Sequence, residues 1–365
     1  MRTFRFAALA LLTVSVLGSA LVQRPSIPYF PDAGGYKTLV CDFHMHTVFS
    51  DGLVWPTVRV DEAWREGLDV IALSDHIEYQ PHKDDIPTNH KRPYEIALPK
   101  AQEMNVLLIK GAEITKSTPP GHYNAVMVTE IGPIDNPDVL DSVKVAAEQK
   151  AFVFWNHHTW QGKDKGQWEE VQTKMFENKW LHGMEVANGG TYYPQAHQWC
   201  LDKNLTMMGN SDIHQPSLYE VYTPLEHRTV TLVLARERSF EAIREALFAG
   251  RTVVWYENQL IGREAYLRPL YEASVSVSKV HQMQDKTGRF VISNTSFLDL
   301  EFERSGKVGP GKIAIPARSS VLVKTAMGEN GSPQTLSYVV KNMLIGPDKG
   351  LPVSFEVSVA EVAAP

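Results

Sequence analysis

DFHMHTVFSDG, residues 42–52, contains two histidines separated by one residue, His44 and His46, and an aspartate five positions after the second, Asp51. The preceding residues are apolar, and alternate side chains of a strand point to the same face, so His44 and His46 can face one metal ion together. Gly52 allows a sharp turn after Asp51. The stretch therefore predicts three metal ligands at one strand end. Histidine pairs also occur in cores and on surfaces, so the rest of the chain must decide.

Composition limits the classes of protein to which the chain can belong. Its 365 residues exceed the usual size of a single core, and 43% are hydrophobic, so one large and one smaller globular domain are expected. A net charge of -6 gives no basic footprint for nucleic acid. A nucleotide or short oligonucleotide substrate stays open, because bound metal ions can outweigh the overall charge locally.

The N-terminus has the layout of a secretory signal peptide. Arg2 and Arg5 precede an apolar run from Phe6 to about Leu17, and small residues follow at 18–20. The run is shorter than the roughly 20 residues that span a membrane, although a retained anchor or a buried helix is the alternative. We expect residues 1–22 to be removed and the protein to be exported, periplasmic or secreted, with no membrane attachment afterwards.

Short apolar runs alternate with amphipathic stretches between residues 38 and 255, which predicts βαβ units with parallel strands. The predicted strands are Thr38–Phe43, Leu68–Leu73, Val106–Ile109, Tyr123–Val128, Ala151–Trp155, Gly183–Val186 and Thr206–Met208. The predicted helices are Val58–Arg65, Pro137–Gln149, Pro194–Asp202 and Phe240–Phe248. Seven such strands suggest an α/β barrel of (β/α)7 type within a domain of residues 23–272.

The composition changes after Ala273, where short strands alternate with Gly, Pro and Asn turns. The predicted strands are Ser274–Ser278, Phe290–Asn294, Leu298–Phe302, Lys312–Ile315, Ser320–Lys324, Leu336–Val340 and Val353–Val359. This pattern predicts a small all-β sandwich over residues 273–365. With no tryptophan and few aromatic residues, this domain gives no sign of a sugar-stacking surface, and we expect it to cover or orient the barrel.

The chain has two cysteines, Cys41 and Cys200. Cys41 falls in the strand that leads to the first histidines, where a buried thiol is expected. The sequence leaves open whether the two form a disulfide in an oxidising compartment.

Five further polar clusters stand at or near the ends of predicted strands. They are Ser74-Asp75-His76, Gly111-Ala112-Glu113, His122, Asn156-His157-His158 and Ser211-Asp212-Ile213-His214. Strand ends of an α/β barrel converge on one rim, so these clusters are expected to share a pocket with His44 and His46. Asp75 is expected to support a ligand or cap a turn.

Residues 38–255 resemble the PHP (polymerase and histidinol phosphatase) superfamily of metal-dependent phosphoesterases in the order of these motifs. The resemblance implies a distorted (β/α)7 PHP barrel with a trinuclear centre. One ion would be bound by His44, His46, Glu113 and Asp212, a second by Glu113, His122 and His157, and a third by Asp51, His76 and His214. Two positions depart from the family: Asp51 stands where several members have histidine, and His158 where proline is common.

The ligand types also indicate which metals bind. Six imidazoles and three carboxylates, without a thiolate, suit two or three divalent transition metal ions, namely Zn, Mn or Fe. Such ions activate water as hydroxide and neutralise phosphoryl oxygens, so the predicted reaction is hydrolysis of a small phosphomonoester or phosphodiester. Asp212, His158 or the third ion would assist the leaving oxygen.

Substrate contacts are expected from loops at the rim. The insertion Glu78–Tyr94 contains Lys91 and Arg92, which would bind phosphate unless the segment is simply a solvated loop. His158 directly follows a ligand and is a second candidate for contact with substrate, and Trp160 either lines the pocket or packs in the core.

Two other functions compete with the phosphoesterase hypothesis. An amidohydrolase-type enzyme that cuts a C–N or C–O bond would need a bridging lysine near a strand end, and Lys110 is the nearby candidate. A non-catalytic protein with structural metals would be expected to lack part of the ligand set, which is complete here.

Overall fold

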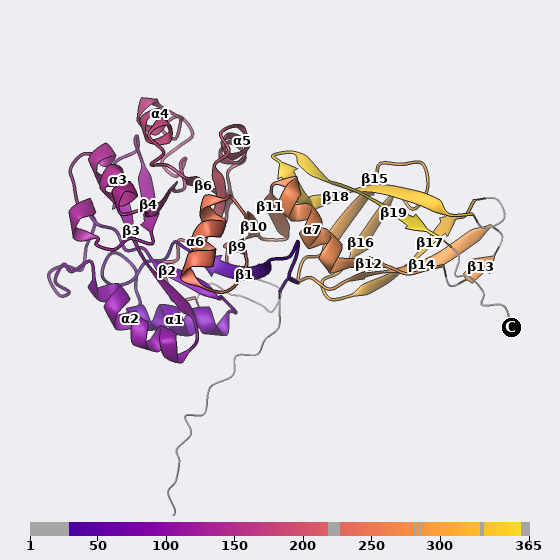
Figure 1. Cartoon of the computed structure of the whole chain (residues 1–365), viewed down its shortest axis with the longest axis horizontal. Helices are drawn as coiled ribbons and strands as arrows, with labels where there is room; N and C mark the ends of the chain where they lie inside the picture. The colour runs from indigo at the N-terminus through magenta and orange to yellow at the C-terminus, as the bar shows by residue number, and fades with distance from the viewer. Residues whose placement is uncertain (1–28, 218–226, 281, 285, 329–331, 359–365) are drawn as a thin grey trace, which may run out of the picture.

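The computed structural model describes residues 29–217, 227–280, 282–284, 286–328 and 332–358. An N-terminal part of strands and helices lies beside a C-terminal part built of strands along the long axis of the molecule (Figure 1). The predicted signal peptide, residues 1–22, lies outside the described residues. Within the described ranges, no helix combines the length and apolar character needed to cross a membrane.

The N-terminal part contains all seven strands that the sequence predicts and four that it does not. Its strands are β1 (Lys37–Asp42), β2 (Val70–Leu73), β3 (Leu107–Thr115), β4 (His122–Val126), β5 (Phe152–Trp155), β6 (Gly183–Asn188), β7 (Thr191–Tyr192), β8 (Thr206–Asn210), β9 (Val230–Ala235), β10 (Thr252–Tyr256) and β11 (Gln259–Gly262).

The strands of this part form a mixed sheet, so the parallel βαβ units that the sequence predicts make up only part of it. β1, β2 and β3 are parallel, as are β5, β6 and β8. β4 is antiparallel to both β3 and β5, because only six residues connect β3 to β4 and a parallel crossover needs a dozen or more. β9 is antiparallel to β1 and β10.

The two ends of this sheet approach each other where β8 faces β9 and β10. The backbone N of Gly209 donates to Thr231 Oγ1 over 3.0 Å, and Thr252 Oγ1 donates to the Met207 carbonyl over 2.7 Å. A Cβ at Gly209 would lie 2.2 Å from Val254 Cγ1, so only glycine permits this approach. The arrangement is compatible with a distorted barrel.

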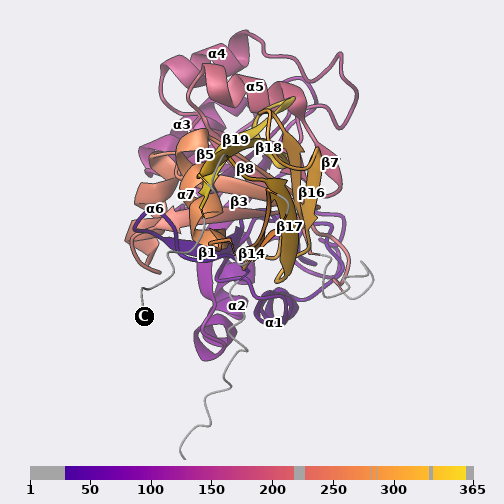
Figure 2. The same cartoon turned by 90° about the vertical axis from the view of Figure 1, so that its right-hand side faces the viewer.

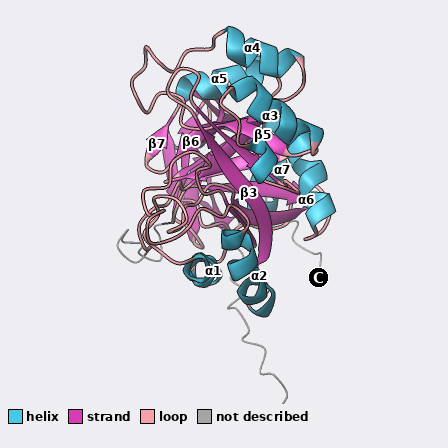
Figure 3. Ribbon diagram, turned by 90° about the vertical axis from the view of Figure 1, so that its left-hand side faces the viewer, coloured by secondary structure: helices cyan, strands magenta, loops and turns pink. Residues whose placement is uncertain are grey.

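Seven helices lie among the described elements: α1 (Pro56–Arg65), α2 (Arg92–Glu103), α3 (Val139–Glu148), α4 (Glu170–Glu177), α5 (Pro194–Asp202), α6 (Phe240–Phe248) and α7 (Glu264–Ser274), with a short 3-10 turn at Gly132–Ile134. They lie outside the sheet, with α1 beside α2 (Figure 3). The sequence analysis missed α2, α4 and α7. Two of these contain an internal proline, Pro99 or Pro269, which usually signals a helix end.

The C-terminal part is a two-sheet β-domain (Figure 2). Its strands are β12 (Val275–Val277), β13 (Gln282–Gln284), β14 (Thr287–Asn294), β15 (Leu300–Arg304), β16 (Lys312–Ile315), β17 (Ser320–Ala326), β18 (Gln334–Gly346) and β19 (Lys349–Val357). β14 pairs with β12, β13 and β17 in one sheet, while β15, β16, β18 and β19 belong to the other. This confirms the all-β sandwich that the turn pattern predicts.

The two parts are joined by more than a linker. β11 pairs in parallel with β18 through Leu260 and Met343 and through Ile261 and Leu344, so one sheet runs from the barrel into the sandwich. One continuous cluster of buried apolar side chains extends from Val40 in β1 to Val357 in β19. The sandwich is therefore fixed against the barrel by backbone hydrogen bonds and by a shared core.

The two cysteines do not form a disulfide in the structure. Cys41 in β1 and Cys200 in α5 are both buried and free, which answers the question that the sequence leaves open.

Candidate metal centre

All nine predicted metal ligands come together at one rim of the barrel. His44 and His46 follow β1, His76 follows β2, His157 follows β5, and Asp212 and His214 follow β8, each at a carboxyl end. Glu113 lies in β3 and His122 is the first residue of β4. Because β3 and β4 are antiparallel, the start of β4 lies at the same rim as the end of β3.

Three ligand groups share Glu113 or His46. The first is built on His44 and His46, whose Nε2 atoms each lie 3.3 Å from Glu113 Oε2. The same two nitrogens lie 3.1 and 3.0 Å from Asp212 Oδ1. Two imidazoles and two carboxylate oxygens therefore converge on one point, as expected for the first ion.

The second group uses the other oxygen of Glu113. His122 Nδ1 lies 3.0 Å and His157 Nε2 lies 3.5 Å from Glu113 Oε1, and His157 Nε2 is 3.6 Å from Asp212 Oδ2. The two oxygens of Glu113 thus face different sets of histidines. This is the arrangement of a carboxylate that bridges two ions.

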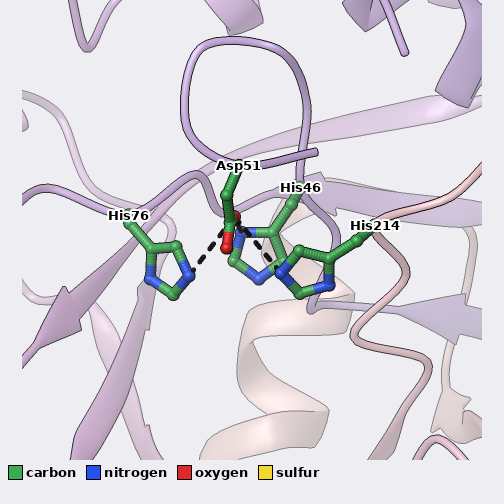
Figure 4. A group of neighbouring side chains, drawn as sticks. All are labelled: His46, Asp51, His76 and His214. Carbon is green, nitrogen blue, oxygen red and sulfur yellow. Dashed lines mark ion pairs between the residues drawn. The ribbon is translucent and has the colours of Figure 1, made fainter. Parts of the chain in front are cut away.

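The third group surrounds Asp51 (Figure 4). Asp51 Oδ1 lies 3.2 Å from His214 Nε2 and 3.5 Å from His76 Nε2. His46 Nδ1 is 3.8 Å away, so His46 belongs to this group as well as to the first. The sequence places His46 at the first ion alone, whereas in the structure it belongs to two ligand groups.

The polar atoms of these groups fit a bound cation. Three buried atoms make no hydrogen bond of suitable geometry, namely His46 Nε2, Asp51 Oδ1 and Asp212 Oδ1. Each nevertheless lies within 4 Å of an imidazole nitrogen or a carboxylate oxygen of another ligand. Buried polar atoms normally have partners. Imidazole nitrogens and carboxylate oxygens that face one another without aligned hydrogen bonds present their lone pairs to a shared point, as ligands of one ion do. The residues present therefore fit divalent transition metals.

The pKa values of the ligands show how strongly the site favours positive charge. Burial alone would raise the pKa of Glu113, but His76 and His44 outweigh it and hold that pKa well below its usual range. Burial also opposes protonation of His44, yet Asp212 and Glu113 raise the pKa of His44 well above its usual value. Metal ions compete with protons for such ligands, so a cation in the proton's place would satisfy the same carboxylates.

His46 differs from its neighbours in charge. Burial and the positive charge of His76 lower the pKa of His46 to about 3, so its imidazole is neutral at physiological pH. A neutral imidazole is the form that binds a metal.

Glu185 in β6 supports the centre and is absent from the ligand set that the sequence predicts. Its Oε1 lies 2.9 Å from His44 Nδ1 and accepts from Asn210 Nδ2 over 3.0 Å, and its Oε2 accepts from the His157 backbone N over 2.9 Å. A carboxylate on the second nitrogen of a ligating histidine fixes its ring orientation. The only sequence signal is a glutamate within the otherwise apolar Gly183–Ala187 run.

Asp75 supports the centre through a loop rather than through a ligand ring. It accepts from Thr47 N over 2.7 Å, from Thr47 Oγ1 over 2.8 Å and from Ser50 Oγ over 2.7 Å. Ser50 Oγ in turn lies 3.3 Å from His46 Nδ1. Asp75 therefore holds the loop between His46 and Asp51 in place.

Arg59 in α1 ties two ligand segments together. Its guanidinium donates to the carbonyls of His46 over 2.9 Å and Ile213 over 3.0 Å, and it pairs with Glu62 over 2.7 Å. The arginine is fully buried. Its position in the sequence, three residues after Pro56 and four before Ala63, is the one indication that it lies on the buried face of the helix.

A cavity of about 560 Å³ opens over the centre. Six predicted ligands line it, namely Asp51, His76, His122, His157, Asp212 and His214, together with Thr159, Trp160, Asn188, Thr191 and Tyr193. His44, His46 and Glu113 lie beneath it and are fully buried. The volume is in the range that holds a small-molecule substrate.

Three residues predicted to contact substrate do not line this cavity. His158 is 3% exposed, its Nδ1 lies 2.7 Å from the Gly166 carbonyl, and its ring packs against Trp155 and Trp199. Lys91 and Arg92 are exposed and pair with Glu130 and Glu95 over 2.6 and 2.8 Å. The sequence shows charge and adjacency to a ligand, but it does not show the direction in which a side chain points.

Lys110, the candidate bridging lysine of the amidohydrolase alternative, also lies away from the centre. Its Nζ donates to the Thr129 carbonyl over 2.8 Å and lies 5.2 Å from the centroid of the Tyr94 ring.

Comparisons with known proteins agree with this site. A solved two-domain protein from Bacteroides vulgatus, which contains a predicted PHP-like metal-dependent phosphoesterase, is 42% identical to this chain, with a TM-score of 0.86. The match covers 90% of this chain and 97% of that one. Residues 274–356 match the family model DUF5001, an Ig-like domain. The search of curated proteins found no match.

Two more distant structures are similar over part of the chain. An amidohydrolase from Chromobacterium violaceum is 14% identical, with a TM-score of 0.37, over 49% of this chain and 88% of its own. A protein from Bifidobacterium adolescentis, named provisionally as a metal-dependent phosphoesterase, is 15% identical, with a TM-score of 0.36, over 57% and 96%. Both likenesses are too weak to bear on fold or function.

The fold and the ligand set define a metal-dependent hydrolase. Given 42% identity over nearly the whole length, the chain belongs to the family of two-domain PHP-like metal-dependent phosphoesterases.

Proposed function

We propose that this protein hydrolyses a small phosphoester at a centre of three divalent transition metal ions, Zn, Mn or Fe. The observation that carries the proposal is Glu113, whose Oε2 lies near His44 and His46 while its Oε1 lies near His122 and His157. A carboxylate shared in this way suits two adjacent ions, and the group around Asp51 provides ligands for a third.

Ions at these positions would supply activated water and charge neutralisation for the phosphoryl oxygens. The residues of the chain provide the rest. Glu185 orients His44 directly, and Asp75 orients the ligands through the loop that it holds. The cavity walls would position the ester. Asp212 lines the cavity and His158 does not. Although burial opposes it, His44 and His46 hold the pKa of Asp212 well below its usual range, so we assign to this carboxylate the transfer of a proton from the attacking water to the leaving oxygen.

The amidohydrolase alternative has less support. Its bridging lysine would have to be Lys110, whose ammonium group is bound to Thr129 away from the ligands. Glu113, which faces two sets of histidines, would fill the bridging role instead.

The proposal is tested by loading the purified protein separately with Mn, Zn and Fe and assaying phosphomonoesters and phosphodiesters. We expect turnover by at least one metal form and its loss in His44→Ala. His82→Ala, a histidine outside the cavity lining, is the matched control. No turnover by any form, with His44→Ala indistinguishable from the wild type, would contradict the proposal.

The number of ions is tested separately by elemental analysis of the loaded protein. Three ions per chain are expected. Two would contradict the third ion, which the group around Asp51 would hold, and one or fewer would rule out a multinuclear centre even if hydrolysis were observed.

We further propose that the protein is exported to the periplasm or secreted and meets its small phosphorylated substrate there, free of the membrane. The support is the sequence of residues 1–22. Mass spectrometry of protein from the native host should show a mature N-terminus near Leu21. Intact Met1 would contradict cleavage.

A further inference from the structure

Trp160 is an unusual wall for a metal centre. Its side chain is 53% exposed, yet it lines the cavity, with its ring centroid 5.4 Å from that of His122 and 5.9 Å from that of His157. Its backbone N donates to the His157 carbonyl over 2.9 Å, which fixes the main chain of Trp160 relative to a ligand. A large apolar face held open beside the candidate ligands is available to stack on a flat group of the substrate.

Another part of the cavity lining is polar but neutral. It is formed by Asn188, Thr191 and Tyr193, at and around the turn between β6 and β7. The lining thus contains both an aromatic ring and neutral groups able to form hydrogen bonds. The two substituents on one phosphate could each contact one of these.

The charge of the cavity also discriminates. Among the residues that the structure describes, its lining contains neither lysine nor arginine. Three carboxylates, those of Asp51, Glu113 and Asp212, would offset half of the charge that three divalent ions bring. A phosphomonoester carries up to two negative charges and a phosphodiester one, so only the monoester brings a second charge that no lysine or arginine of the lining can pair with.

We infer that the substrate is a phosphodiester with a flat ring on one ester group, and that Trp160 binds this ring. The inference rests on the proposed phosphoesterase function. In the reaction, the oxygen of water bonds to phosphorus and the bond from phosphorus to one ester oxygen breaks. A proton passes to the leaving oxygen, which gives an alcohol or phenol and a phosphomonoester.

The charge preference is tested with methyl 4-nitrophenyl phosphate and 4-nitrophenyl phosphate. These esters share a leaving group and differ in one methyl group and one negative charge. We expect kcat/KM to be higher for the diester in the metal-loaded wild type. A higher value for the monoester would overturn the inference while leaving the phosphoesterase function intact.

The role of Trp160 is tested in the same assay. Loss of an aromatic stacking partner should lower kcat/KM of Trp160→Ala for the diester by about tenfold, mainly through KM. Trp160→Phe should restore most of this loss. Phe240→Ala, which removes an aromatic side chain that is 39% exposed and outside the cavity lining, should match the wild type.

Calorimetric binding gives a readout without turnover. The monomethyl ester of phenylphosphonate should bind the metal-loaded wild type about tenfold more tightly than that of ethylphosphonate, and Trp160→Ala should abolish this difference. Equal binding of the two, or a preference that survives in Trp160→Ala, would overturn the inference. Failure of the wild type to hydrolyse any phosphoester in the panel would instead overturn the proposed function, and this inference with it.

Discussion

The rim of the barrel and the interior of the sandwich are both buried, but they are built from opposite chemistry. In the barrel, the fully buried side chains include His44, Glu113, Arg59 and Glu185. In the described part of the sandwich, the buried polar residues are uncharged, for example Asn294 and Thr325. The first region therefore depends on partners for its charges, and the second on apolar packing.

The strands differ in the same way. All six residues of β9 are buried, whereas buried and partly buried residues alternate along β14. A strand covered on both faces reads as a continuous apolar run, and a strand with one solvated face alternates. The barrel therefore buries charged groups, at a cost in free energy, where the candidate chemistry takes place, while the sandwich is a support attached through the pairing of β11 with β18.

The largest effect of a single substitution is expected at Glu113. Glu113→Gln should lower phosphoester hydrolysis by at least about a thousandfold, because the shared carboxylate that would hold two ions is lost. Elemental analysis should show fewer ions per chain. Glu303→Gln in the sandwich, which changes an exposed glutamate, should keep both activity and metal. Equal activity of Glu113→Gln and the wild type would contradict the assignment.

A core residue of the sandwich should show the opposite behaviour. Phe302 is buried and its ring contacts those of Tyr271 and Tyr338. Phe302→Ala should lower the free energy of unfolding by about 3 kcal/mol in denaturant titration, since it leaves a cavity. Metal content per folded molecule should stay unchanged. Leu322→Ala, at a site 65% exposed, is the control and should change stability by less than about 0.5 kcal/mol.

The pH dependence of stability provides a third test. Burial, with the nearby charge of Arg263, lowers the pKa of His197 from its ordinary value of 6.5 to about 4. Below pH 6.5 the unfolded chain therefore binds a proton that the folded chain does not, and stability falls as the pH drops toward 4. Between pH 7 and 5 this residue should account for a loss of about 2 kcal/mol.

The measurement is the free energy of unfolding at several pH values for the wild type and His197→Gln. The difference between the two should shrink as the pH falls. Leu322→Ala, which changes no titratable group, serves as the control, and its offset from the wild type should stay constant. Parallel curves for the wild type and His197→Gln would contradict the prediction.

The smallest expected effect is at Glu185. Glu185→Gln keeps the shape of the side chain but removes the charge beside His44 Nδ1. Metal affinity measured by competition with a chelator should fall by about tenfold, as for other carboxylates that orient a histidine ligand. Glu301→Gln in the sandwich should leave it unchanged. An unaltered affinity in Glu185→Gln would mean that the hydrogen bond does not tune the ligand.

Local patterns made much of the molecule predictable. The seven barrel strands that the sequence predicts are present, and the predicted bounds of α5, α6 and β16 match the structure. These elements carry clear signals, such as the proline at the start of α5 and Ser239, which caps α6 by accepting from Ala242 N. The helix α2, which was not predicted, begins within the insertion Glu78–Tyr94. Its prolines, one at the start and Pro99 inside, conceal the helical period in the sequence.

The residues that gather at the candidate metal centre could also be predicted from the sequence. Eight of the nine predicted ligands are brought together because they stand at or near a strand end, and such ends meet at a barrel rim. The ninth, Asp51, reaches the same place through the loop that Asp75 holds. The directions of His158, Lys91 and Arg92 were not readable. Each depends on neighbours from distant segments, such as Gly166 for His158 and Glu130 for Lys91.

The sequence by itself determined the α/β fold, the β-sandwich and the set of histidines and carboxylates that gather at the candidate metal centre, because periodicity and residue type act locally. Only the tertiary structure decided that β4 runs antiparallel and that Glu185 and Arg59 support the ligands. It also decided that Trp160, rather than a cation, forms the cavity wall. These features depend on which distant backbone and side-chain atoms lie within about 4 Å of one another, and spacing along a chain does not encode such contacts.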